Sequence, residues 1–168
     1  MDPIRRRLLG GRHPSAAQRY LPPWAGDAQA FLQRCTRCGD CVRACPTGLL
    51  EPDVDGYPSP QFARAACSLC GDCATACAPR ALDRSDGRVA FAHVAQIEAG
   101  CLALQGIECR VCGEACETSA ITFRPQLRAV AQPAIDASRC SGCGACVAIC
   151  PSHAVALRSP SETAVESE

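Results

Sequence analysis

The residues of this chain best suited to chemistry are sixteen cysteines, which fall into four groups of four. The groups are Cys35, Cys38, Cys41 and Cys45; Cys67, Cys70, Cys73 and Cys77; Cys101, Cys109, Cys112 and Cys116; and Cys140, Cys143, Cys146 and Cys150. Three groups share the spacing C-x2-C-x2-C-x3-C, whereas the third begins with C-x7-C. Successive groups start 32 to 39 residues apart, which indicates an internal repeat.

This spacing predicts iron–sulfur clusters. Cysteines three residues apart on a looping backbone direct their thiolates to one side, where three of them bind three iron atoms of a 4Fe–4S cubane. In two-cluster ferredoxins the fourth cysteine binds the neighbouring cluster. Structural zinc prefers two ligand pairs separated by a longer stretch, and disulfide scaffolds belong to oxidising compartments. The four groups therefore predict four 4Fe–4S clusters, with all sixteen cysteines as ligands.

The third group departs from the regular pattern in two ways. Seven residues separate Cys101 from Cys109, and Glu117 follows Cys116 where groups one and four have a proline. Because this group still contains four thiols, we predict a fourth cluster with an inserted loop rather than a vestigial site.

The sequence leaves two ways to pair the groups. Stretches of 21 to 23 residues separate successive groups, and such even gaps favour tandem pairs, the first group with the second and the third with the fourth. Cys77 would then complete the first cluster and Cys45 the second. A nested arrangement, which pairs the first group with the fourth and the second with the third, is supported by the Cys-Pro endings of groups one and four.

The elements that must position these ligands are short. A short apolar piece follows each group, and Asp55-Gly56 and Asp86-Gly87 are typical of hairpin turns. Helical turns are expected between the third and fourth cysteines. We therefore expect an α+β, ferredoxin-like fold of two pseudo-repeated units with two clusters each. The predicted segments are an Arg- and Pro-rich arm (1–26), a first unit with groups one and two (27–97), a second unit with groups three and four (98–158) and a disordered acidic tail (159–168).

Composition agrees with a cluster scaffold and excludes several function classes. Leu, Ile, Val and Phe make up about 18% of the chain, below the roughly 20% typical of an apolar core, so metal binding is expected to supply much of the folding free energy. Zero net charge and 4% aromatic residues argue against nucleic-acid binding.

The uncharged window 140–157 holds four cysteines and a proline, which suits a ligand loop rather than a membrane span. Residues 5–11 (RRRLLGG) precede no apolar segment, which favours the cytoplasm over export.

The motifs also favour an electron relay over an enzyme. The sequence contains no nucleotide-binding glycine motif and no nucleophile motif. Because sixteen cysteines suffice for four clusters, His13, His93 and His153 are predicted to have structural or solvent roles. Asp40 and Asp72 lie inside the first two ligand loops, where their negative charge is predicted to lower the cluster potentials relative to the fourth.

Beyond the regular motifs, the chain resembles the NapF-type ferredoxins, accessory proteins of periplasmic nitrate reductase. The resemblance rests on the RRRLL opening, on Pro22-Pro23-Trp24, on Phe31-Leu32, and on CLALQGIECRVCGEACETSAI across the third group. Trp24 is expected to pack on the domain. It implies a cytoplasmic protein that binds the nitrate reductase catalytic subunit before export and takes part in its maturation, by supplying electrons or assisting iron–sulfur assembly. The alternative is a general soluble ferredoxin that shuttles electrons between a reductase and a quinone- or molybdenum-linked enzyme.

Overall fold

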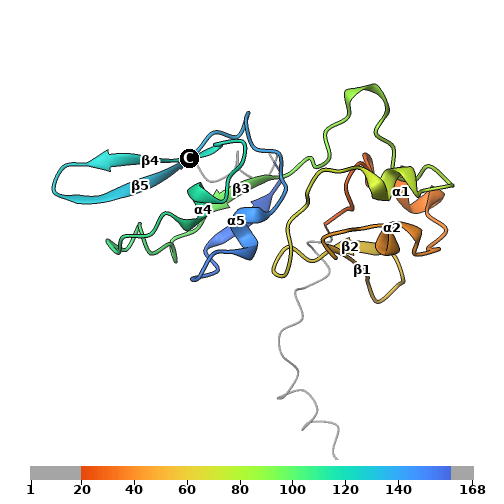
Figure 1. Cartoon of the computed structure of the whole chain (residues 1–168), viewed down its shortest axis with the longest axis horizontal. Coiled ribbons are helices and arrows are strands. Elements are labelled where there is room, and N and C mark those ends of the chain that lie inside the picture. Colours follow the sequence, from red (N-terminus) through yellow and green to blue (C-terminus); the bar gives the residue numbers. More distant parts are fainter. Residues whose placement is uncertain (1–19, 160–168) are drawn as a thin grey trace, which may run out of the picture.

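The computed structural model describes residues 20–159, which form two halves that lie side by side (Figure 1). The first half contains α1 (Ala28–Arg34), α2 (Asp40–Arg43), β1 (Leu50–Pro52), β2 (Pro58–Pro60), α3 (Asp72–Thr75) and a 3-10 turn (Ser85–Gly87). The second half contains β3 (Val94–Ile97), α4 (Val111–Glu114), β4 (Ile121–Gln126), β5 (Ala129–Ile135), α5 (Ala145–Ala148) and β6 (Val155–Arg158). Most of the predicted arm and nearly all of the predicted tail lie outside the described residues.

Within residues 20–159 the strands form three separate antiparallel pairs. β1 pairs with β2, and Asp53 closes the turn between them by accepting from the N–H groups of Asp55 and Tyr57, both over 2.9 Å. β4 pairs with β5 in a longer hairpin, and β3 pairs with β6. Because β3 precedes the third cysteine group and β6 follows the fourth, their pairing closes the second half.

In the first half, the segment around Trp24 takes the place of such a closing strand pair. The N–H of Trp24 donates to the carbonyl of Ala90 over 2.8 Å, and its carbonyl accepts from the N–H of Asp83 over 3.0 Å. The hairpin predicted at Asp86-Gly87 is not formed; residues 85–87 make a 3-10 turn instead, because Trp24 bonds to both chain segments that the hairpin would pair. Trp24 is only 5% exposed, which confirms that it packs on the protein.

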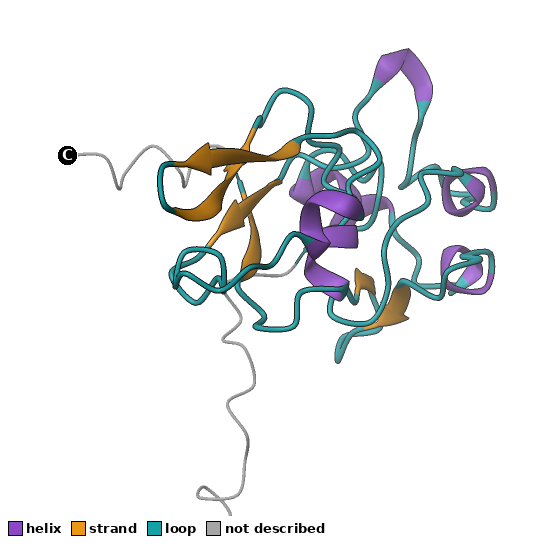
Figure 2. Ribbon diagram, turned by 60° about the vertical axis from the view of Figure 1, so that its left-hand side comes forward, coloured by secondary structure: helices purple, strands orange, loops and turns teal. Residues whose placement is uncertain are grey.

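Each cysteine group contains a one-turn helix that begins one residue before its third cysteine. These helices, α2 to α5, start slightly earlier than the sequence predicts, and loops join them to the strands (Figure 2). No helix within residues 20–159 is long and apolar enough to cross a membrane.

Two clusters of buried side chains form the core, and both include cysteines. The first consists of Trp24, Ala25, Phe31, Cys41, Leu50, Cys73, Ala81 and Leu82. The second consists of Leu49, Phe62, Phe91, Ala95, Cys112, Ile121, Cys146, Val155 and Leu157, and therefore crosses from one half to the other. The third cysteine of every group belongs to one of these clusters, so the ligand loops are part of the core.

An aromatic group joins the two halves. The rings of Tyr20, Phe62 and His93 pack edge to face, with centroids 5.3 to 5.5 Å apart. His93 also stacks on Phe91 with centroids 4.8 Å apart, and its Nε2 lies 2.9 Å from the carbonyl oxygen of Gly142 in the fourth ligand loop. This histidine therefore ties the linker between the halves to that loop.

Two glycines allow this loop to approach the aromatic rings. A Cβ added at Gly144 would lie 2.2 Å from the Phe62 ring, and one at Gly142 would lie 2.8 Å from the Phe91 Cβ. Both glycines also have positive φ, 78° and 71°, which other residues rarely adopt. The contact between the halves thus depends on the absence of a side chain at both positions.

Candidate metal centres

The thiols of the first two cysteine groups gather in two places, and each place mixes both groups. Cys77 lines the same cavity as Cys35, Cys38 and Cys41. Conversely, Cys45 lines a cavity with Cys67, Cys70 and Cys73. This is the arrangement that tandem pairing requires, in which the last cysteine of each group completes the neighbouring ligand set. We call these sets shell 1 and shell 2, after the group that supplies three of their thiols.

The second half follows the same scheme. Cys116 lines a cavity with Cys140, Cys143 and Cys146, which we call shell 4, and Cys67 of shell 2 lines the same cavity from the first half. In the irregular group, Cys101 and Cys109 lie close enough to Cys112 to raise its pKa. By analogy with the other three sets, Cys150 is assigned to this one, and we call Cys101, Cys109, Cys112 and Cys150 shell 3.

The third thiol of each group is the most deeply buried, and its ionisation is unfavourable without a cation. Burial first and neighbouring thiols second raise the pKa of Cys41 and Cys112 to about 11. The same causes raise the pKa of Cys73 and Cys146 to about 12. Metal coordination offsets this cost, because a coordinating thiol is deprotonated by the cation.

The thiols surround cavities, as a ligand set around several iron atoms does. Backbone N–H groups approach them as well, with Ala120 donating to the Cys116 sulfur over 3.2 Å and Ala154 to the Cys150 sulfur over 3.3 Å. The residues therefore fit 4Fe–4S clusters.

Hydroxyl groups next to three of the four completing cysteines are a feature that sequence reasoning missed. A Thr or Ser two residues later lies 3.5 to 3.7 Å from the sulfur in the pairs Cys45–Thr47, Cys116–Thr118 and Cys150–Ser152. Burial opposes ionisation of Cys45, but the Thr47 hydroxyl and nearby N–H groups lower its pKa overall. Cys77 has Pro79 at this position, so shell 1 lacks such a hydroxyl. In the sequence, this feature corresponds to the motifs C-x-T and C-x-S at the last cysteine of a group.

Shells 2 and 4 meet where the halves join. The N–H of Cys67 donates to the carbonyl of Cys143 over 2.8 Å, which links ligands of the two shells directly through the backbone. Shells 1 and 2 share the first half, and shells 3 and 4 share the second. The shells therefore follow one another in the order 1, 2, 4, 3, with the irregular shell at one end.

The inserted loop of the third group is packed rather than loose. Ala103 is fully buried at 0% exposure, and its carbonyl accepts from Gln132 Nε2 on β5 over 3.2 Å. The loop between Cys101 and Cys109 is thus held against the β4–β5 hairpin.

Arginines cover the exposed ligands of the first half. Cys38 and Cys70 are the exposed cysteines of the described chain. Arg43 donates to the Cys38 carbonyl over 3.3 Å, and Arg84 donates to the Cys70 carbonyl over 2.9 Å. Arg43 also forms an ion pair with Asp40, whose pKa is lowered first by a hydrogen bond with Cys38 and then by Arg43.

Neither of the two histidines within residues 20–159 lines a thiol cavity. His93 contributes to the contact between the halves, and His153 is exposed at a turn with φ 51°. His13 lies outside the described residues. These positions agree with the structural or solvent roles predicted for His93 and His153.

Comparison with known proteins places the motifs in one class. A family model described as a 4Fe-4S dicluster domain matches residues 34–87 and 107–154. The ferredoxin-type protein NapF of Escherichia coli (strain K12) is 43% identical over 92% of this chain and 94% of its own length. NapF of Haemophilus influenzae is 43% identical over 81% of this chain and 77% of its own. The methylamine utilization ferredoxin-type protein MauM of Paracoccus denitrificans is 34% identical over 90% and 75%, respectively.

The family model covers the first, second and fourth cysteine groups and Cys109, Cys112 and Cys116 of the third, but not Cys101. These matches show that the chain has a small ferredoxin-like iron–sulfur fold with few helices and short strands, and that it holds 4Fe–4S clusters. Ferredoxin-type proteins of this kind carry electrons and are not enzymes in the ordinary sense.

Proposed function

This chain belongs to the NapF family of ferredoxin-type iron–sulfur proteins, and from that premise we propose that it acts in the cytoplasm on the catalytic subunit of periplasmic nitrate reductase. It binds the precursor of that subunit before export. It then supplies electrons to the precursor or assists assembly of its iron–sulfur cluster. Both activities require a partner surface, and the first also requires a route for electrons through the protein.

The series of thiol shells carries this proposal. We propose that the sixteen cysteines hold four 4Fe–4S clusters, one in each of shells 1, 2, 4 and 3. When bound, each cluster accepts and releases one electron. The polypeptide holds the ligands of neighbouring shells in contact, above all through the Cys67–Cys143 backbone bond at 2.8 Å. The protein thus offers a continuous route from one end to the other.

Iron content tests the number of clusters. Anaerobically purified protein is expected to contain about sixteen iron and sixteen sulfide per chain, since each cubane holds four of each. About twelve of each would mean that shell 3 is empty and would reduce the proposal to three clusters.

Capture of the precursor tests the function. The holoprotein is immobilised and exposed to purified catalytic-subunit precursor that lacks its cluster, and to the mature subunit as control. We expect lasting capture of the precursor. Electron transfer is measured separately with precursor that carries its iron–sulfur cluster, which can accept electrons, as loss of the reduced-cluster EPR signals of dithionite-reduced, desalted holoprotein. Electron transfer without lasting capture would instead favour the general shuttle between a reductase and a quinone- or molybdenum-linked enzyme.

A further inference from the structure

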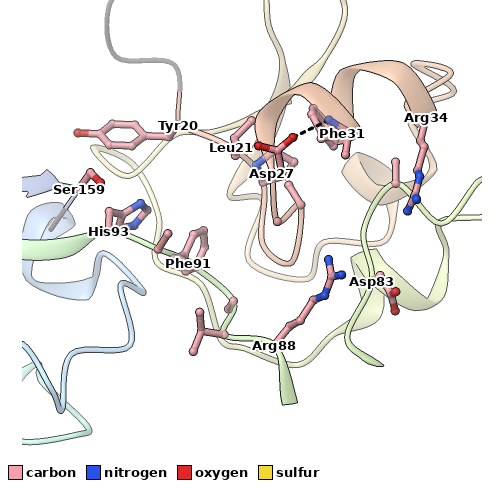
Figure 3. Close-up of a pocket in the computed structure, with 18 of the residues that line it drawn as sticks. Tyr20, Leu21, Asp27, Phe31, Arg34, Asp83, Arg88, Phe91, His93 and Ser159 are labelled. Atoms are coloured by element: carbon pink, nitrogen blue, oxygen red, sulfur yellow. Dashed lines mark hydrogen bonds between the residues drawn. The ribbon is translucent and has the colours of Figure 1, made fainter. Parts of the chain in front are cut away.

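A large cavity opens beside shell 1, between α1 and the segment 80–93 (Figure 3). Its volume is about 720 Å³, within the range of roughly 300–1,000 Å³ that is typical of binding sites. It does not belong to any thiol shell, and none of the roles described above uses it.

The cavity has an aromatic end and a basic end. Tyr20, Phe91 and His93 lie at one end, and Arg34 and Arg88 lie at the other (Figure 3). A third arginine, Arg80, also lines the cavity. An occupant that matches both ends must therefore combine apolar surface with negative charge.

The three arginines keep their hydrogen-bonding capacity. All three are exposed, and none of their guanidinium groups forms an ion pair within residues 20–159. Arg88 and Arg80 act on the nearby Asp83 and help to lower its pKa, but backbone and hydroxyl bonds from Ser85 come first. Guanidinium groups of this kind match carboxylates in forked, paired hydrogen bonds.

The carboxylates that line the cavity are already engaged. Asp27 caps α1, with its Oδ1 accepting from the N–H of Ala30 over 2.9 Å. Asp83 accepts from the N–H and the hydroxyl of Ser85 over 2.9 and 2.8 Å. The three arginines also outnumber the two aspartates of the lining, and this positive balance favours an acidic occupant.

The cavity adjoins two ligand shells. Phe31 and Ala81 line both this cavity and the cavity of shell 1. Leu157 lines both this cavity and that of shell 4. An occupant would thus be separated from either shell by single side chains, which suits a docking position for a redox partner.

We propose that this cavity docks an acidic segment of the catalytic-subunit precursor. Aspartate or glutamate side chains of that segment bind Arg34, Arg80 and Arg88, and its apolar side chains lie against the half-buried Tyr20 and the exposed Val89. This proposal rests on the proposed function, because it names the surface by which the precursor is held.

A matched pair of double variants tests it. Arg34→Gln/Arg88→Gln removes two charges from the cavity, and Arg124→Gln/Arg128→Gln removes two exposed charges from the β4–β5 hairpin as control. We expect the cavity variant to bind the purified precursor about tenfold more weakly and with a smaller dependence on salt, since charged hydrogen bonds are lost. The hairpin variant should bind like the wild type. Iron content and the visible spectrum show that each variant holds its clusters.

A steric variant tests the cavity without changing charge. Ala92 is exposed and lines the cavity, so Ala92→Trp should fill part of it and weaken capture of the precursor to a similar degree. Unchanged capture by both cavity variants, while the wild type binds, would overturn the docking site and leave the proposed function standing. Failure of the wild type to capture the precursor would overturn both.

The acidic residues that follow Ser159 in this chain are the alternative occupant that the experiment must test. Glu162, Glu166 and Glu168 follow Ser159, which also lines the cavity. A variant that ends at Ser159 should capture the precursor like the full chain. If this variant and the arginine variant both capture more precursor than the wild type, the acidic segment of this chain occupies the cavity, and the proposed partner site is wrong.

Discussion

The two halves of the molecule hold their thiols in the same way but frame them differently. In the second half, β3 and β6 pair across the two ligand groups, and the β4–β5 hairpin extends from the body (Figure 1). In the first half, the Trp24 segment bonds to the chain on both sides where a strand pair would close the unit. Either a strand pair or a single chain segment can therefore close a unit of two ligand loops, because a bound cluster supplies much of the folding free energy.

The halves also differ in charge at the two ends of the shell series. Residues 34–45, around shell 1, contain three arginines and one aspartate. Residues 98–117, around shell 3, contain four glutamates and one arginine. The two ends thus present opposite charges, which favours different partners at each end.

Serine substitutions test whether both halves pair their ligands alike, and they should have the largest effect. Cys77→Ser is expected to lose about four iron atoms, and Cys35→Ser/Cys77→Ser no more, because both thiols serve one cluster. Cys35→Ser/Cys45→Ser should lose about eight, because its two thiols serve different clusters. Iron and sulfide analysis of anaerobically purified protein measures the losses.

The same comparison in the second half uses Cys101→Ser with either Cys150→Ser or Cys116→Ser. We expect about four iron atoms lost in the first double variant and about eight in the second. Equal losses within either half would contradict the tandem arrangement there.

Gly144→Ala should break the contact between the halves. A Cβ at this position would lie 2.2 Å from the Phe62 ring, and overpacking of this kind costs about 1–3 kcal/mol. Gly106→Ala is the matched control, because Gly106 also has positive φ but nothing lies within 4 Å of its added Cβ. Anaerobic thermal unfolding should show a clearly lower Tm for Gly144→Ala; equal Tm values in both variants would mean that backbone strain alone is responsible.

The missing hydroxyl in shell 1 predicts a difference in potential between the shells. Pro79→Thr should raise the midpoint of that cluster by about 20–60 mV, which corresponds to a hydrogen bond of roughly 0.5–1.5 kcal/mol for one electron. Thr118→Val should lower the shell 4 midpoint by a similar amount, because it removes the hydroxyl 3.5 Å from the Cys116 sulfur. EPR-monitored redox titration measures both, and unchanged midpoints would show that these hydroxyls do not tune the clusters.

The smallest effect should come from the aspartates of the first two loops. Asp72→Ala is expected to raise the shell 2 midpoint by no more than about 20 mV, since exposed charges are screened. Asp40→Ala should have less effect on shell 1, because Arg43 already neutralises Asp40. A larger shift for Asp40→Ala in the same titration would reverse this ranking.

Much of the candidate site could be predicted from spacing alone. Three thiols at intervals of three residues must come together because the chain between them is short, so shells 1, 2 and 4 could be expected in large part. The fourth ligand of each shell could not be predicted. About twenty residues separate successive groups, and a connection of that length is compatible with both the tandem and the nested pairing. Only the packing of distant segments brings Cys77 to the cavity of Cys35 and Cys45 to the cavity of Cys67.

The sequence by itself determined the chemistry: sixteen soft ligands at cluster spacing, and too few aliphatic side chains to form a core without them. Only the tertiary structure decided the order of the shells, the replacement of a strand pair by the Trp24 segment, and the arginine-lined cavity beside shell 1. Local spacing constrains atoms a few residues apart, whereas these three features depend on which distant segments can pack together. Gly142 and Gly144 are an example, because their role became visible only once the aromatic rings of another segment were in place beside them.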